Sequence, residues 1–205
     1  MKRQIVIATS NPGKLQELRS LLADLPFDLR DLNSFGRIEP VAENGSTFME
    51  NASLKASGYA RQTGLMTLAD DSGLEVESLG GRPGVQSARY AGPAASDRER
   101  VHKLLSELDG VAWADRAARF VSAIAIADGG GAIINVSVGT CGGRIVEAPR
   151  GENGFGYDPV FVPDGFAETF AELPGEIKNR ISHRGKSLKD AVAFLGSLTV
   201  PQRAG

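Results

Sequence analysis

The sequence predicts an α/β protein with a mixed β-sheet, and three observations support this. Residues 3–9 form an apolar, β-branched run that is typical of a buried strand, and a well-capped helix follows it. Two long β-rich runs flank Asp128-Gly-Gly-Gly131, which predicts an antiparallel hairpin. Further helical patterns lie before and after that hairpin. This mixed order argues against a purely parallel, doubly wound sheet.

The first helix is predicted to begin directly after the first strand. Asn11 is a good N-cap residue, and Pro12 suits the first helical position, where its missing N–H costs nothing. Leu15, Leu18 and Leu22 recur at helical spacing, so they are expected to face the core.

Three more helices and one short strand follow from the same reasoning. Thr47 and Glu50 have the spacing of a capping box and begin a helix whose apolar stripe is Phe48, Ala52, Ala56 and Tyr59. The run LMTLA, residues 65–69, is predicted to be a short buried strand that ends at Asp70 and Asp71. Residues 96–108 form a third helix, stopped by Gly110, and a last helix begins at about Gly185.

Composition limits the class of protein and its partners. The 205 residues suit a single domain, and 41% hydrophobic and 23% charged residues are ordinary for a soluble globular protein. The net charge of −2 gives no general attraction to nucleic acid or to an anionic membrane. A single cysteine, Cys141, excludes an internal disulfide. With neither a membrane-length apolar run nor a signal peptide, the expected location is the cytoplasm.

The first glycine-containing loop could bind an anion. A P-loop needs Gly-x-x-x-x-Gly-Lys-Ser/Thr, but Ala8 replaces its first glycine and Leu15 its hydroxyl residue, so this is not a Walker A motif. Unpaired N–H groups at the helix start, with Gly13 and Lys14, could still hold a phosphate. The alternative is a plain capped helix with a solvated lysine, and this stretch alone slightly favours that alternative.

The segment ADDSG contains two adjacent carboxylates. Like charges repel, and a magnesium ion would relieve the repulsion, since it binds one or two carboxylates together with substrate phosphates. The candidate ligands are Asp70, Asp71 and the upstream Glu43. The alternative is an ordinary turn after a strand. Ser72 lacks the Gly-x-Ser-x-Gly context of a nucleophile elbow, so a serine hydrolase is disfavoured.

The segment GENGFGYDPVFVP could expose an aromatic ring to a ligand. Phe155 stands between Gly154 and Gly156, and an aromatic side chain on such a loop can stack on a nucleobase. The alternative is that Phe155, Tyr157 and Phe161 form the core face of a strand at period two.

The segment EIKNRISHRGKSL is strongly basic. Five basic residues lie within nine positions: Lys178, Arg180, His183, Arg184 and Lys186. Lys178 and the His183-Arg184 pair could donate hydrogen bonds to the carbonyl oxygens of a purine. The alternative is a solvated helix face. The other histidine, His102, lies on the third helix between basic neighbours and is expected at the surface.

Taken together, five segments in this order resemble the inosine triphosphate pyrophosphatase family: ATSNPGKLQEL, TFMENASLKA, ADDSGLEVESLGGRPGVQSARYAG, GFGYDPVF and ISHRGKSL. The resemblance implies one domain over residues 1–205, with an elongated mixed sheet, flanking helices and two lobes around a central cleft. It also implies a homodimer that hydrolyses non-standard purine nucleoside triphosphates (dITP, ITP, XTP) to the monophosphate and pyrophosphate, with Mg²⁺.

The resemblance also implies roles for individual residues. Asp71 would be the catalytic carboxylate and a metal ligand, with Glu43 and Asp70 as further ligands. The family often has two glutamates where this chain has Ala42-Glu43, so Glu43 is the only acidic candidate there. The triphosphate would be held by Thr9, Ser10, Asn11, Pro12, Gly13 and Lys14. Ser72 would contact substrate, and the base and ribose would meet Phe155, Gly156, Tyr157 and Asp158. The 6-keto edge of the purine would be recognised by Lys178, His183 and Arg184.

Two other functions compete with this interpretation. One is a phosphohydrolase or kinase that acts on ordinary nucleotides, and the other is a nucleotide-binding regulator without catalysis. The adjacent aspartates beside a candidate metal argue against the regulator. Hydrolysis of dITP, XTP, dGTP and ATP compared side by side would separate all three.

Overall fold

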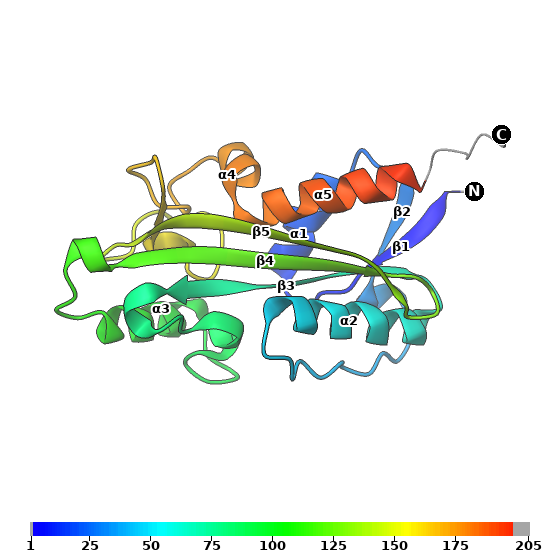
Figure 1. Cartoon of the computed structure of the whole chain (residues 1–205), viewed down its shortest axis with the longest axis horizontal. Helices are drawn as coiled ribbons and strands as arrows, with labels where there is room; N and C mark the ends of the chain where they lie inside the picture. The colour runs from blue at the N-terminus through cyan, green and yellow to red at the C-terminus, as the bar shows by residue number, and fades with distance from the viewer. Residues whose placement is uncertain (1, 199–205) are drawn as a thin grey trace. The chain divides into compact units, whose positions relative to one another are not determined.

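A computed structural model describes residues 2–198 of the chain. A six-stranded sheet forms its framework, with the strand order β2-β1-β3-β4-β5-β6. In chain order the strands are β1 (Arg3–Ile7), β2 (Phe27–Asp31), β3 (Met66–Val76), β4 (Ala117–Ala127), β5 (Ile133–Ile145) and β6 (Phe161–Pro163) (Figure 1).

The sheet is mixed, as predicted. Strand β1 runs parallel to both neighbours, with Ile5 opposite Leu29 of β2 and Met66 of β3. At the other edge β6 pairs antiparallel with β5. The predicted hairpin joins β4 and β5, and the Asp128 N–H donates to the Ala132 carbonyl oxygen at its turn.

The four predicted helices are present, and side-chain caps explain where the first three begin. They are α1 (Pro12–Leu22), α2 (Phe48–Thr63), α3 (Asp97–Glu107) and α5 (His183–Ser197), and a further helix, α4 (Gly175–Ile181), precedes α5. Asn11 Oδ1 accepts the Lys14 N–H at 3.0 Å, with Pro12 at the first position of α1. Both reciprocal bonds of a capping box are made at the starts of α2 and α3, by Thr47 with Glu50 and by Ser96 with Glu99.

The described residues form two compact units, each with its own apolar core. Unit 1 comprises the described residues up to Asp71, those of Ala123–Val138, and those from Lys186 onward; unit 2 comprises Ser72–Ser122 and Gly139–Gly185. The core of unit 1 is built from β1, β3, β4, α1 and α5, and includes Ile5, Leu18, Leu68, Ile124 and Leu188. That of unit 2 includes Leu74, Leu104, Phe120, Phe161 and Phe170.

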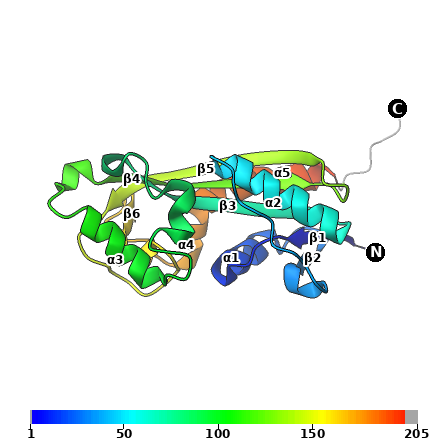
Figure 2. The same cartoon turned by 90° about the horizontal axis from the view of Figure 1, so that it is seen from below.

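Within unit 1, helices α2 and α5 lie on opposite faces of the sheet, as the two views of the chain indicate (Figures 1 and 2). On β5, Ser137 is buried and its hydroxyl donates to the Ser187 carbonyl oxygen of α5 at 2.8 Å. Its neighbour Val136 points the other way and lines a pocket with residues of α2. This is the alternation that a strand imposes on successive side chains.

Two sequence predictions about elements need correction. Strand β3 does not end at the aspartates, because it continues to Val76, and Asp70 and Asp71 therefore lie in its interior. The strand continues because Leu74 and Val76 are fully buried in the core of unit 2. The second correction is helix α4, which the sequence analysis did not separate from the basic segment around it.

No helix among the described residues is long and apolar enough to cross a membrane. The expectation that His102 lies at the surface is confirmed, because its side chain is exposed, and Cys141 is buried.

Candidate functional site

Two of the three predicted acidic residues of unit 1 meet around one lysine. The Lys55 ammonium donates to Asp71 Oδ1 and to Glu43 Oε2, each at 2.9 Å. Lys55 comes from α2, Asp71 from β3 and Glu43 from the segment before α2. The Lys55 and Asp71 side chains are only about a tenth exposed, whereas that of Glu43 is about a third exposed. The cluster therefore reaches from the interior to the surface.

Burial and charge act against each other in this cluster. Burial raises the pKa of Asp71, and the positive charges of Lys55 and Lys14 offset the rise only in part. Burial also works against the charge of Glu43, but the Lys55 ammonium outweighs it and lowers the pKa of Glu43. Burial alone would lower the pKa of Lys55, but the carboxylates of Asp71 and Glu43 raise it above its usual value. Lys55 is consequently a cation at neutral pH.

One oxygen of Asp71 is open to a ligand. Asp71 Oδ2 is buried and has no hydrogen-bond partner in the structure, while Oδ1 is bonded to Lys55. A buried carboxylate oxygen without a partner is costly and rare in native proteins. It marks a place where a water, a metal ion or a substrate group would be stabilised.

Sequence reasoning missed Lys55, although a signal for it was present. Asn51 and Lys55 lie one helical turn apart on the same side of α2 as Ala52 and Ala56, and all four are buried. Polar residues on the buried side of an amphipathic helix need partners. That spacing could have directed attention to Lys55, but not to the identity of its partners.

Asp70, the other of the two adjacent aspartates, pairs with a different lysine, Lys14. Asp70 is fully buried, and its Oδ2 lies 2.8 Å from the Lys14 ammonium, which is itself only 15% exposed. Neighbouring residues of a strand point to opposite faces, so Asp70 turns toward α1 and Asp71 toward α2. The expected repulsion between the aspartates is thus relieved by two lysines.

The alternative of a solvated lysine after a capped helix is wrong, since Lys14 is held against Asp70. The segment from Thr9 to Lys14 nevertheless forms an accessible helix start. Thr9 Oγ1 accepts the Asn11 N–H at 3.2 Å, and Ser10, Asn11 and Pro12 are exposed. Gly13 lies half-buried between them and Lys14.

The predicted base-binding residues belong to unit 2, together with Ser72. Phe155 is half-buried, and two cations lie over its ring, with Lys178 Nζ 5.0 Å and Arg184 Cζ 5.6 Å from the ring centroid. Arg184 also donates to Ser72 Oγ at 2.8 Å. Lys178 forms a 2.7 Å ion pair with Asp158, and both are buried. His183 stacks on Phe120 with the ring centroids 4.6 Å apart.

The competing interpretations of these segments are decided by burial. Lys178, His183 and Arg184 are at least 94% buried, so they are not a solvated helix face, whereas Arg180 and Lys186 are exposed. The strand interpretation of the aromatic segment is also wrong, because residues 150–157 form turns and a short 3₁₀ helix follows them. Tyr157 and Phe161 join the core of unit 2.

Comparison with known proteins assigns the chain to a family. The family model described as the Ham1 family matches residues 5–194. The chain belongs to the Ham1 family.

Members with assigned names and solved structures resemble this Ham1 chain over nearly its full length. A Geobacillus kaustophilus protein named dITP/XTP pyrophosphatase is 52% identical, over 91% of both chains. One of the same name from Geobacter sulfurreducens is 48% identical, over 94% of this chain and 98% of the relative. The structure of a HAM1 protein from Coxiella burnetii has 43% identity and a TM-score of 0.86, and covers 95% of this chain and 99% of its own.

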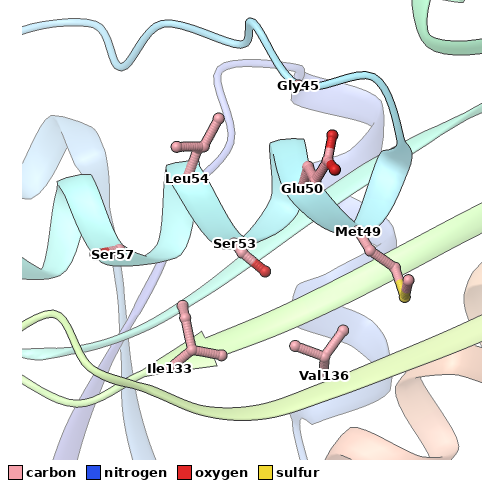
Figure 3. A pocket seen from close by; sticks show the side chains of 8 residues that line it. All are labelled: Gly45, Met49, Glu50, Ser53, Leu54, Ser57, Ile133 and Val136. Carbon is pink, nitrogen blue, oxygen red and sulfur yellow. The ribbon is translucent and has the colours of Figure 1, made fainter.

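A separate apolar pocket on unit 1 of the Ham1 chain does not suit a nucleotide. Its volume is about 620 Å³, and its walls include Met49, Leu54, Ile133 and Val136 (Figure 3). The charged residue on its wall is Glu50, an anion that accepts bonds in the capping box. Among the described residues that line the pocket, a triphosphate would meet no cation, so size alone does not make this pocket a substrate site.

Proposed function

We propose that this chain is a nucleoside triphosphate pyrophosphohydrolase that converts dITP, ITP and XTP to the monophosphate and pyrophosphate. The observation that carries the proposal is the cluster of Asp71, Lys55 and Glu43, in which a buried carboxylate keeps one oxygen without a partner. The name dITP/XTP pyrophosphatase of the relatives supports the same reaction.

The triphosphate is assigned to residues of unit 1. The start of α1 presents backbone N–H groups and the positive end of the helix dipole, which favour a phosphate. Lys14 adds a full positive charge beside them and is positioned by Asp70. The residues from Thr9 to Gly13 would complete the contact with the triphosphate. Positive charge at the start of α1 suits the leaving pyrophosphate, whose negative charge grows as it departs.

Asp71 is assigned as the residue that accepts a proton from the attacking water. The water oxygen forms a bond to the α-phosphorus, the bond from the α-phosphorus to the bridging oxygen breaks, and pyrophosphate leaves with that oxygen. Asp71 Oδ2 is the atom free to take the proton. A carboxylate whose pKa is raised by burial is better matched to this task than an ordinary aspartate.

Magnesium fits this cluster as a cofactor. The partly exposed carboxylate of Glu43 and the carboxylate of Asp71 would hold the ion, whereas Asp70 is paired with Lys14 on the opposite face of β3. When bound, Mg²⁺ neutralises charge on the phosphates. No group of three or more Asp, Glu, His or Cys side chains within residues 2–198 is arranged as a metal site. Substrate phosphates would therefore complete the coordination, as is usual for Mg²⁺.

The purine is assigned to residues of unit 2. Phe155 supplies a ring on which a base can stack. Lys178, His183 and Arg184 are donors for the 6-keto oxygen of hypoxanthine or xanthine, with Ser72 beside Arg184 and with Gly156, Tyr157 and Asp158 forming the adjoining loop. Adenine presents an amino group at C6, which would leave buried donors unpaired, and each unpaired donor costs about 1–3 kcal/mol.

A substrate panel tests the proposal. Hydrolysis of dITP, XTP, dGTP and ATP is measured with and without Mg²⁺, and pyrophosphate and phosphate are scored separately. We expect pyrophosphate from dITP and XTP, only with the metal. Preference for dGTP or ATP would favour an enzyme of ordinary nucleotides, and binding without turnover would favour a regulator. In H₂¹⁸O, attack at the α-phosphorus places the label in the monophosphate.

Two further features belong to the proposal. The family resemblance implies a homodimer, which light scattering would detect as twice the mass of the chain. The nucleotide pool that such an enzyme acts on is intracellular, so we propose that the protein works in the cytoplasm.

A further inference from the structure

The loop that carries Phe155 needs support from outside itself. Phe155 lies between two glycines with positive φ, at 77° for Gly154 and 64° for Gly156. Glycine allows this backbone path, but it also leaves the unfolded loop with more conformations than any other residue would. A ring that must present one face to a base therefore depends on contacts that hold the peptide groups beside it.

Two carboxylates hold the peptide groups on either side of Phe155. Asp158 Oδ2 accepts the N–H of Phe155 at 2.8 Å, from within the same loop. Asp97 Oδ2 accepts the N–H of Gly156 at 2.6 Å, although Asp97 is the first residue of α3 and lies 59 positions away in the sequence. These bonds restrain the backbone before and after the Phe155 Cα atom, and so restrain the direction of its side chain.

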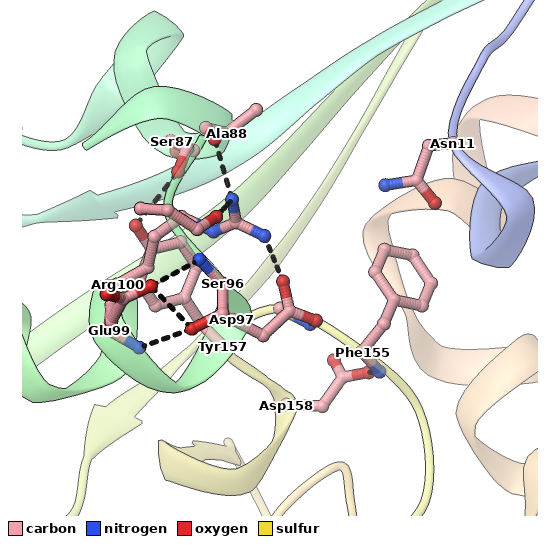
Figure 4. A network of polar contacts seen from close by, with 12 residues as sticks. Asn11, Ser87, Ala88, Ser96, Asp97, Glu99, Arg100, Phe155, Tyr157 and Asp158 are labelled. Atoms are coloured by element: carbon pink, nitrogen blue, oxygen red, sulfur yellow. Dashed lines mark hydrogen bonds and ion pairs between the residues drawn. The ribbon is translucent and has the colours of Figure 1, made fainter. Parts of the chain in front are cut away.

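Asp97 is itself held in place. Its Oδ1 forms an ion pair with Arg100, one turn further along α3. Arg100 in turn donates to the carbonyl oxygen of Ala88 at 2.8 Å (Figure 4), and to that of Ala95 at 2.6 Å. Helix α3 is anchored by its capping box and by the buried Val101 and Leu104. The Gly156 N–H is thus bonded to an acceptor on a fixed element.

We propose that Asp97 is a positioning residue for base recognition, which sets the orientation of Phe155 through the N–H of Gly156. This inference rests on the proposed function, since it assigns to Phe155 the contact with the purine. Asp97 would not touch the substrate. It would lower the cost of ordering the loop when the base binds, an effect that appears in substrate binding more than in the chemical step.

A simpler role for Asp97 is that of a negative charge in the first turn of a helix, which is favourable on its own. Glu99 offers a matched control, because it occupies the same turn and its carboxylate accepts hydrogen bonds from Ser96. Glu99→Gln removes one charge from that turn and keeps a residue that suits a capping box. Asp97→Asn keeps an oxygen that can accept the Gly156 N–H.

The first experiment is amide hydrogen exchange of the ligand-free protein. In Asp97→Ala we expect the Gly156 amide to exchange at least about tenfold faster, since a hydrogen bond to a charged group is lost. Glu99→Gln should exchange like the wild type at Gly156, and Asp97→Asn should retain most of the protection. Wild-type exchange at Gly156 in Asp97→Ala, or exchange in Asp97→Asn as fast as in Asp97→Ala, would overturn the inference.

The second experiment is the kinetics of pyrophosphate release from dITP. Asp97→Ala should raise KM by about tenfold and change kcat by less than about threefold, while Glu99→Gln leaves both unchanged. An equal rise in KM for Glu99→Gln would overturn the inference. If Asp97→Ala unfolds, Asp97→Glu displaces the carboxylate by one methylene and should raise KM in the same way. If the wild type releases no pyrophosphate from dITP, the proposed function fails, and exchange at Gly156 still decides the positioning contact.

Discussion

The Lys55 ammonium donates a 2.9 Å hydrogen bond to one oxygen of Asp71 and leaves the other oxygen of that buried carboxylate without a partner. Burial raises the pKa of Asp71, and the Lys55 ammonium offsets part of that rise. A carboxylate in this state can accept a proton or bind a cation.

Asp71→Asn should abolish turnover and leave the fold intact. The amide has the shape of the carboxylate and can still accept the Lys55 bond through its oxygen, but it takes up a proton far less readily. We expect pyrophosphate release from dITP to fall by at least about 100-fold. The matched control is Asp109→Asn, a change at an exposed aspartate that should leave activity unaltered. A well-folded Asp71→Asn protein with near wild-type turnover would remove Asp71 from its assigned role.

Lys55 and Asp71 should be coupled in stability. Lys55→Gln leaves the buried Asp71 carboxylate without its cation, which should lower the free energy of unfolding by about 3 kcal/mol. In Lys55→Gln/Asp71→Asn both charges are absent, so the double variant should be more stable than the sum of the single losses predicts. Urea unfolding of the four proteins measures the coupling, which we expect to exceed about 1 kcal/mol. Purely additive losses would show that the pair contributes nothing as a pair.

Alanine should destabilise the protein at Gly185 but not at Gly196 of the same helix. A Cβ atom at Gly185 would overlap the carbonyl oxygen of Asn179, and the Gly185 N–H donates to Ser182 Oγ at the corner between α4 and α5. Gly185→Ala should therefore displace the adjoining His183 and Arg184, lower stability by about 2 kcal/mol or more, and weaken dITP binding.

Gly196→Ala is the control, since a Cβ atom there meets nothing within 4 Å. Alanine is a better helix former than glycine, so the free energy of unfolding of the Gly196→Ala protein should stay the same or rise by about 0.5 kcal/mol. Thermal unfolding compares the two variants. An equal effect of both substitutions would contradict the role of the corner.

Deprotonation of Tyr90 should lower the free energy of unfolding at high pH. Its hydroxyl donates to Glu107 Oε2 at 2.7 Å, and burial, followed by the Glu107 carboxylate, raises the pKa of Tyr90 to about 12. The folded state therefore holds this proton more tightly than the unfolded chain, in which tyrosine titrates near about 10. The stabilisation of the folded state by protonated Tyr90 is therefore present in full below about pH 10 and is lost as the pH rises through about 12.

Tyr90→Phe isolates this effect, since it has no proton to lose. It should be less stable than the wild type at pH 8, by about 1–2 kcal/mol for the lost hydrogen bond, and the difference should shrink between pH 10 and 12. Urea unfolding across this range provides the measurement. A constant difference between the two proteins would show that Tyr90 titrates normally.

The sequence by itself determined the features that depend on near neighbours in the chain. Asn11 with Pro12, Thr47 with Glu50, and Ser96 with Glu99 begin helices at the expected places, because each capping bond spans three residues or fewer. The hairpin at Asp128–Gly131 was predictable for the same reason. The family motifs located the candidate residues, since their order in the chain is itself the signal.

Only the tertiary structure decided which charges meet. Lys55 bonds to Glu43 and Asp71, which lie 12 and 16 positions away in the sequence. The adjacent residues Asp70 and Asp71 pair with different lysines, because neighbouring side chains of a strand point to opposite faces. The sequence also did not determine which charged residues are buried. Lys178 and Arg184 are of residue types that usually lie at the surface, yet both are buried. A charge can be buried only where packing supplies a partner, and that partner depends on how distant segments come together.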